Sequence, residues 1–89
     1  MKTIRIRVTG KVQGVFYRKT AKDRAIELGV TGWVRNEDDG SVTIEATGDP
    51  EQLINLVAWC ADGPPRAIVE DVKVENIPFQ DFPHFMSER

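Results

Sequence analysis

A segment with two glycines that ends in an arginine, residues 10–18, is the part of the chain best suited to chemistry. It reads Gly-Lys-Val-Gln-Gly-Val-Phe-Tyr-Arg, after an alternating apolar pattern and before a helical one. Glycines at a strand-to-helix turn let backbone N–H groups converge on an oxyanion, and the helix start adds its positive end. Arg18 supplies a planar, permanently charged fork that matches phosphate oxygens. We therefore predict a phosphate site made by Arg18 and the backbone amides of Gln13, Gly14, Val15, Phe16 and Tyr17.

The charge distribution supports an anion site at this end of the chain. Residues 1–24 carry eight basic side chains and one acid, although the formal net charge of the whole chain is −2. A local positive field attracts small anions and speeds their arrival. The alternative is that these side chains form the solvated faces of a strand and a helix.

The groups that commonly attack phosphorus are absent from the segment, which has no cysteine, serine or histidine. Cys60 falls on an apolar stripe and is interpreted as a packing residue, and His84, beside Pro83, as a surface residue. Asp38 and Asp39 lie in a polar turn, where acids are common, and one such turn is weak evidence for magnesium. We therefore predict no metal site and no cofactor.

Such a site can still act on a reactive substrate, and acyl phosphates fit this description. Their leaving group is a carboxylate whose conjugate acid has a pKa of about 4, so it departs without a general acid. Phosphoryl transfer depends mainly on positioning and charge stabilisation. Arg18 and the loop amides would hold the phosphoryl oxygens, while the side-chain carbonyl of Asn36 would orient an attacking water. Asn36 could alternatively just cap a hairpin.

The first half of the chain must supply the elements that position these residues. Apolar residues alternate at Ile4, Ile6 and Val8, which predicts a half-buried strand. A helical stripe begins near Tyr17, and Gly29 is a natural stop. Residues 32–36 and 42–46 predict two strands joined by the polar turn 37–40.

The second half predicts one more helix and one more strand. Asp49 as N-cap, Pro50 at the first helical position and Gln52 in a capping box predict a helix start. A strand is predicted to follow at about 68–77, and its apolar phase shifts near Glu70-Asp71, which indicates a bulge or break. The helix buries Leu53, Leu56, Val57 and Cys60. Two prolines in residues 78–89 permit only a short extra edge strand there.

The order strand, helix, strand, strand, helix, strand predicts an α+β fold. Two half-exposed helices must cover one face of an antiparallel sheet, giving a ferredoxin-like βαββαβ sandwich. The first two strands then run parallel with the third between them, so their C-terminal ends lie roughly 10 Å apart on one edge. Arg18 and Asn36 should therefore face a common spot. Trp33 and Trp59 are interpreted as packing residues, with Trp33 as an alternative neighbour of the acyl group.

Two long motifs resemble the acylphosphatase family. The first is residues 10–18, and the second is residues 32–42, Gly-Trp-Val-Arg-Asn-Glu-Asp-Asp-Gly-Ser-Val, followed by Ala-Thr-Gly at 46–48. The segment 63–69 before the last strand is also similar, and the likeness extends to about residue 77, whereas the tail matches loosely. The resemblance implies a metal-independent acylphosphatase, with the phosphate-binding arginine at Arg18 and the water-positioning asparagine at Asn36.

Two other classes compete with this interpretation. RNA-recognition domains share the fold but display aromatic residues on their central strands, and residues 41–47 contain none. A non-catalytic phosphate- or carbamoyl-phosphate-binding module of the same fold is the second alternative. Activity on a simple acyl phosphate separates that module from an enzyme.

Length and composition set the remaining expectations. Eighty-nine residues with 40% apolar side chains predict one globular domain, 1–89. A single cysteine, no signal peptide before the first strand and no membrane-spanning stretch predict a cytoplasmic protein. We expect a monomer whose partners are a small acyl phosphate and its product, inorganic phosphate, which should inhibit competitively; neither nucleic acid nor membrane is expected.

Overall fold

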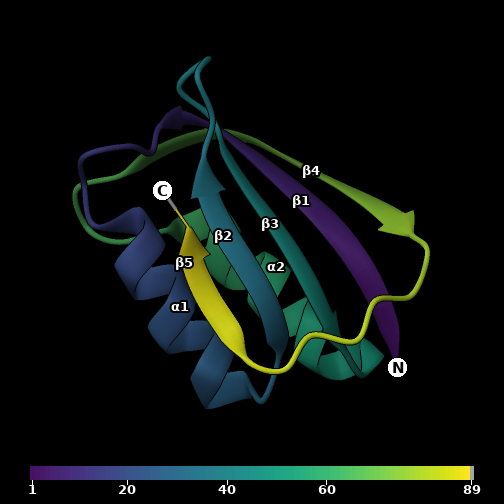
Figure 1. The fold of residues 1–89 in the computed structure, drawn as a ribbon. Coiled ribbons are helices and arrows are strands. Elements are labelled where there is room, and N and C mark those ends of the chain that lie inside the picture. Colours follow the sequence, from purple (N-terminus) through teal and green to yellow (C-terminus); the bar gives the residue numbers. More distant parts are fainter. Residues whose placement is uncertain (89) are drawn as a thin grey trace.

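Two helices pack on one face of a five-stranded sheet (Figure 1). The computed structural model describes residues 1–88. The elements follow in the order β1 (Lys2–Lys11), α1 (Tyr17–Leu28), β2 (Thr31–Asn36), β3 (Val42–Gly48), α2 (Pro50–Asp62), β4 (Ile68–Ile77) and β5 (Phe85–Glu88). The predicted ferredoxin-like βαββαβ order is confirmed, and β5 is the short additional strand that the tail permitted.

The sheet order brings the ends of β1 and β2 to the same edge. The order is β4-β1-β3-β2-β5, with β3 antiparallel to both β1 and β2. β1 and β2 are therefore parallel, one strand apart, as predicted from the topology. The loop after β1 and the end of β2 lie at the same end of the sheet (Figure 1).

The core lies between the helices and the sheet. Ile6 of β1 pairs with Ile44 of β3, and both are fully buried. Of the predicted stripe, α1 buries Tyr17, Ala21 and Ala25, and Leu28 is partly buried. α2 buries Leu53, Leu56 and Cys60, while Val57 packs partly buried against the core. Burial of these apolar faces is the main stabilisation of such a layered fold.

Local signals in the sequence end and start the helices as expected. Gly29 adopts a left-handed conformation (φ 78°) after α1, and its N–H reaches the carbonyls of Ala25 and Ile26. At the start of α2, the backbone N–H of Asp49 donates to Oε1 of Gln52 at 2.8 Å, the reciprocal arm of a capping box.

The predicted bulge in the fourth strand is also confirmed. Thr9 pairs with Asp71, whereas the next residue, Gly10, pairs with Val69, so Glu70 is the extra residue. The shift occurs one residue before the end of β1 and so immediately precedes the glycine-containing loop.

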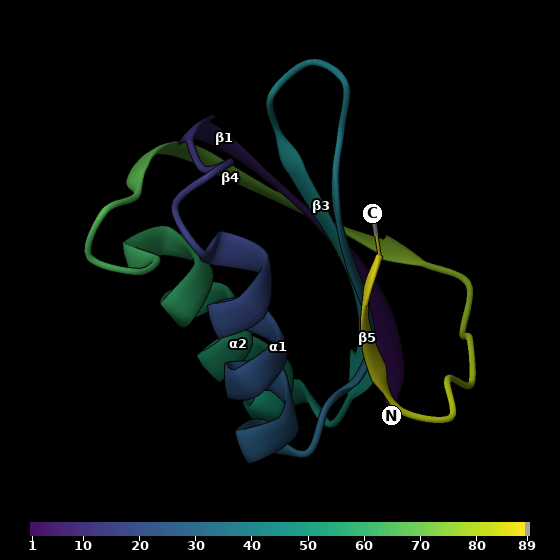
Figure 2. The same cartoon turned by 60° about the vertical axis from the view of Figure 1, so that its left-hand side comes forward.

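The tail crosses the face of the sheet that the helices leave open (Figure 2). The N–H of Gln80 donates to Oγ1 of Thr3 at 2.9 Å, and Oγ1 of Thr47 donates to the carbonyl of Gln80 at 2.7 Å. The chain then returns as β5, which pairs in parallel with β2 and buries Phe85. No helix among the described residues has the length and apolar character needed to cross a membrane.

Candidate active site

The loop between β1 and α1 is held in place by the core and by the β2–β3 hairpin. Val12 and Val15 are buried in the core, which fixes the loop against the sheet. The side-chain amide of Gln13 donates to the carbonyls of Glu37 and Ser41 at 2.8 and 2.9 Å. The loop is therefore held at the base of the β2–β3 hairpin, next to the end of β2.

The backbone of this loop is left-handed at two positions. Gly14 and Phe16 have positive φ, 73° and 66°. Among residues 1–88, Phe16 alone has a positive φ without being a glycine. A left-handed conformation costs a residue such as phenylalanine roughly 1–2 kcal/mol, and such strain gathers at functional sites. Alternation of left- and right-handed residues turns successive N–H groups toward one side. Thr20 donates to the Phe16 carbonyl, so the first-turn N–H groups before it have no partner within the helix.

Arg18 and Asn36 line the same open pocket, of about 480 Å³. Arg18 comes from the first turn of α1, and Asn36 is the last residue of β2. Of the predicted cradle residues, Gly14, Phe16 and Tyr17 also line the pocket, whereas Gln13 and Val15 do not. The remaining lining residues are Lys19, Lys22 and Ser87.

Both central side chains are presented to the pocket. Arg18 is half-buried, and its Nη1 donates to the backbone carbonyl of Glu88 in β5, which fixes one side of the guanidinium. Asn36 pairs through its backbone with Val42, and its side-chain amide makes no hydrogen bond within residues 1–88. A guanidinium has five donors and an amide both accepts and donates, so each keeps capacity for a ligand.

The pocket is positively charged. Among residues 1–88, the ionisable side chains of its lining are Arg18, Lys19 and Lys22 apart from the phenol of Tyr17, and none is an aspartate, glutamate, histidine or cysteine. Tyr17 is buried, and its hydroxyl donates to the Cys60 carbonyl at 2.7 Å. Burial raises the pKa of Tyr17 well above its ordinary value, so it stays neutral. Ser87 offers a hydroxyl, but no general base adjoins it in the lining to activate it as a nucleophile.

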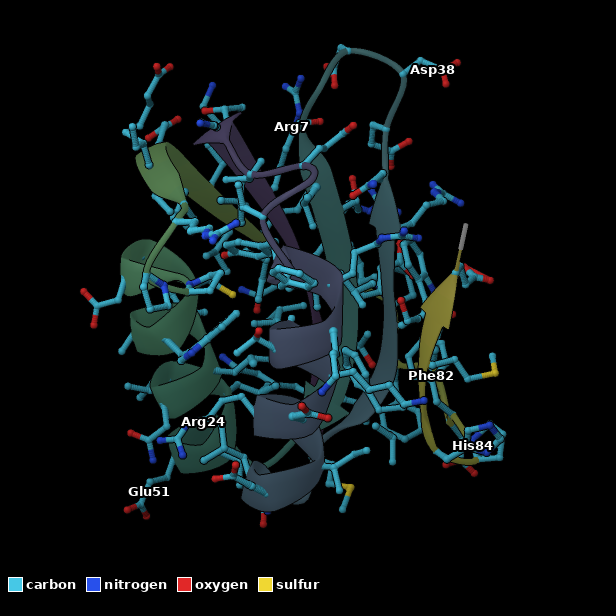
Figure 3. The ribbon with its side chains drawn as sticks, turned by 90° about the vertical axis from the view of Figure 1, so that its left-hand side faces the viewer. Arg7, Arg24, Asp38, Glu51, Phe82 and His84 are labelled. Atoms are coloured by element: carbon cyan, nitrogen blue, oxygen red, sulfur yellow. The ribbon has the colours of Figure 1, made fainter. Side chains whose placement is uncertain are left out.

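Cys60, His84 and Asp38, for which the sequence predicted no catalytic role, are not among the residues that line the pocket. Burial raises the pKa of the Cys60 thiol to about 12, which leaves it protonated and unreactive. His84 is exposed at the start of β5, at the opposite end of the sheet from the hairpin turn that carries Asp38 (Figure 3). Within residues 1–88, no group of three or more His, Cys, Asp or Glu side chains is arranged to hold a metal ion.

Family comparison decides which class of protein carries this pocket. The family model described as acylphosphatase matches residues 4–86. The chain belongs to the acylphosphatase family. It is 52% identical over 79 residues to an acylphosphatase of Marinobacter nauticus, covering 88% of this chain and 86% of that protein.

Solved acylphosphatase structures share the fold almost throughout. That of Coxiella burnetii superposes with a TM-score of 0.95 at 39% identity, over 98% of this chain and 92% of the other. That of Bacillus subtilis gives a TM-score of 0.96 at 33% identity, with both chains fully covered. The acylphosphatase assignment made from residues 10–18 and 32–42 is therefore confirmed.

The structure also adds pocket residues that sequence reasoning missed. Lys22 lies four residues after Arg18 and three after Lys19, helical spacings that were present in the sequence. No such signal marked Ser87, which lines the pocket, or the Glu88 carbonyl, which bonds to Arg18. Their positions depend on the pairing of β5 with β2. Trp33 is not among the lining residues: the Arg35 guanidinium lies 4.7 Å from its ring centroid. Trp59 packs on Tyr17, with ring centroids 5.1 Å apart, as a packing residue should.

Proposed function

We propose that this acylphosphatase-family protein hydrolyses acyl phosphates to a carboxylate and inorganic phosphate. Arg18 and the loop amides of residues 13–17 hold the phosphoryl group, and the Asn36 side-chain carbonyl orients a water. The observation that carries the proposal is that Arg18 and Asn36 line one cationic pocket, whose lining within residues 1–88 has no nucleophile–base pair.

The reaction is a direct displacement at phosphorus. The oxygen of water forms a bond to phosphorus as the bond from phosphorus to the acyl oxygen breaks, and that electron pair leaves on the carboxylate. A phosphoryl oxygen takes the proton from water, so no protein base is needed. The work of the protein is positioning and charge stabilisation, which supply most of the rate in phosphoryl transfer.

The remaining parts of the proposal follow from the same pocket. The enzyme works without metal or cofactor, and inorganic phosphate, which fits the phosphoryl cradle, inhibits competitively. We further propose a cytoplasmic monomer formed by one domain, with neither nucleic acid nor membrane as partner.

The test is hydrolysis of benzoyl phosphate in excess EDTA by the parent and by Asn36→Ala. Loss of the water-orienting amide should lower kcat by about 100-fold or more, while inhibition by phosphate persists. Asn76→Ala, on the exposed edge strand β4, is the matched control. Full turnover by Asn36→Ala would remove the proposed role of Asn36. No turnover by a folded parent would leave a phosphate-binding module instead of an enzyme.

A further inference from the structure

The pocket extends beyond the residues proposed to hold the phosphoryl group. It continues along α1 to Lys22, with Ser87 of β5 also in its lining. Lys22 is four residues after Arg18, about one helical turn or 6 Å along the axis. Residues at this spacing share a helix face, so Lys22 lies next to Arg18 on the side away from the loop.

The two lysines of the pocket differ in their ionic partners. Nζ of Lys19 lies 3.0 Å from the Asp23 carboxylate on the next turn of α1. Lys22 forms no ion pair within the part of the chain that the structure describes, and its side chain is half-buried. An ammonium that meets no carboxylate among the described lining residues can pair with an anionic group of a ligand.

We propose that Lys22 is a specificity-determining residue that binds a second anionic group at the far end of the acyl moiety. The inference rests on the proposed function, because Arg18 must hold the phosphoryl end of the same molecule. The preferred substrates are then acyl phosphates whose acyl chain ends in a carboxylate or a phosphate.

The helical spacing of Arg18 and Lys22 gives the scale of that acyl chain. In an extended acyl phosphate with two methylenes before a terminal carboxylate, five bonds join phosphorus to the last carbon. Bonds of about 1.5 Å in a zigzag give a span of roughly 6 Å, the same as one helical turn. Succinyl phosphate, which has this length, is therefore the probe for a ligand held by both Arg18 and Lys22.

Succinyl phosphate and butyryl phosphate test the proposal, because they differ only in a terminal carboxylate against a methyl group. Lys22→Gln should lower the ratio of kcat/KM for succinyl phosphate to that for butyryl phosphate by about fivefold to tenfold. Lys22→Arg should restore most of the ratio, which a loss of packing alone would not allow. Lys11→Gln is the control: Lys11 is exposed at the end of β1, near the loop but outside the lining.

Each other outcome overturns the inference in a distinguishable way. An unchanged ratio in Lys22→Gln would mean that Lys22 does not read the acyl end. An equal fall of the ratio in Lys11→Gln would assign the preference to long-range attraction by the positive field. Failure of the parent to hydrolyse either substrate would reject the proposed function, and this inference with it.

Discussion

The guanidinium of Arg18 donates through Nη1 to the backbone carbonyl of Glu88, seventy residues away in the chain. Arg18 stands in the first turn of α1, and Glu88 ends β5, the edge strand that pairs with β2. β5 thus orients the guanidinium that would bind the phosphoryl group. A hydrogen bond to a charged group contributes about 1.5–3 kcal/mol, and a pre-oriented arginine loses less entropy on binding.

Removal of this carbonyl should therefore weaken the site without dismantling the fold. A chain that ends at Met86 keeps Phe85, the buried residue of β5, but lacks residues 87–89 and with them the Glu88 carbonyl. We expect the inhibition constant of inorganic phosphate to rise about tenfold, because Arg18 is no longer held. Full-length Ser87→Ala controls for the lost hydroxyl, and far-UV circular dichroism checks the fold. Unchanged phosphate inhibition in the shortened chain would show that the carbonyl contributes no orientation.

Replacement of Arg18 by lysine should not preserve activity. Lysine keeps the charge, but its compact ammonium lacks the planar fork of a guanidinium, so it cannot hold the Glu88 carbonyl on one side and present two parallel donors to the phosphoryl group on the other. Arg18→Ala and Arg18→Lys should both lose turnover of benzoyl phosphate by about 100-fold or more. Phosphate inhibition should weaken more in the alanine variant, which also loses the charge. Near-parental turnover in Arg18→Lys would mean that charge alone suffices.

Gly10 should tolerate no side chain, because β4 approaches it closely at the bulge. Its φ is 125°, and a Cβ there would lie 2.2 Å from the carbonyl oxygen of Ile68. Gly10→Ala should lower the free energy of unfolding by about 3–5 kcal/mol, since both backbone strain and overlap with backbone must be relieved. Gly40→Ala, also at positive φ (93°) but with nothing near its Cβ, should lose only about 1–2 kcal/mol. Urea unfolding of the two variants measures the difference, and equal losses would contradict the role of close approach.

The topology was predictable because short-range patterns determined it. The phase shift between Val69 and Val72 indicated the bulge that the structure places at Glu70. The parallel arrangement of β1 and β2 followed from element order, and with it the common pocket of Arg18 and Asn36. These features need only alternation, capping residues and the constraints of a two-layer sandwich.

The C-terminal part of the site was not predictable in the same way. β5 has four residues, of which only Phe85 is buried, so it carries almost no alternation. Its place beside β2 depends on the tail crossing the open face, where Gln80 bonds to Thr3 and Thr47. Such long-range bonds between threonine hydroxyls and the backbone leave no periodic trace in the sequence, so neither Ser87 in the pocket nor the Glu88 carbonyl beside Arg18 could be predicted.

The turn of the β2–β3 hairpin should make stability depend on pH at low pH. Oδ1 of Asp39 accepts hydrogen bonds from the hydroxyl and the N–H of Ser41 at 2.6 and 2.9 Å, and Oδ2 pairs with Arg7. The Ser41 hydrogen bonds, and then Arg7, lower the pKa of Asp39 to about 2. A depressed folded-state pKa gives stability that is fully present above the unfolded value of about 4 and is lost as pH falls toward 2.

Asp39→Asn removes this contribution and is the direct test. The parent should be more stable than Asp39→Asn at pH 6, and the gap in the free energy of unfolding should close between about pH 4 and pH 2. Asp38→Asn deletes the same charge in the same turn but leaves the Ser41 bonds in place, so its gap should be smaller at pH 6. Urea unfolding at several pH values measures all three proteins. A parent and an Asp39→Asn variant with the same pH profile would show that the Ser41 and Arg7 contacts add no stability to the hairpin beside the pocket.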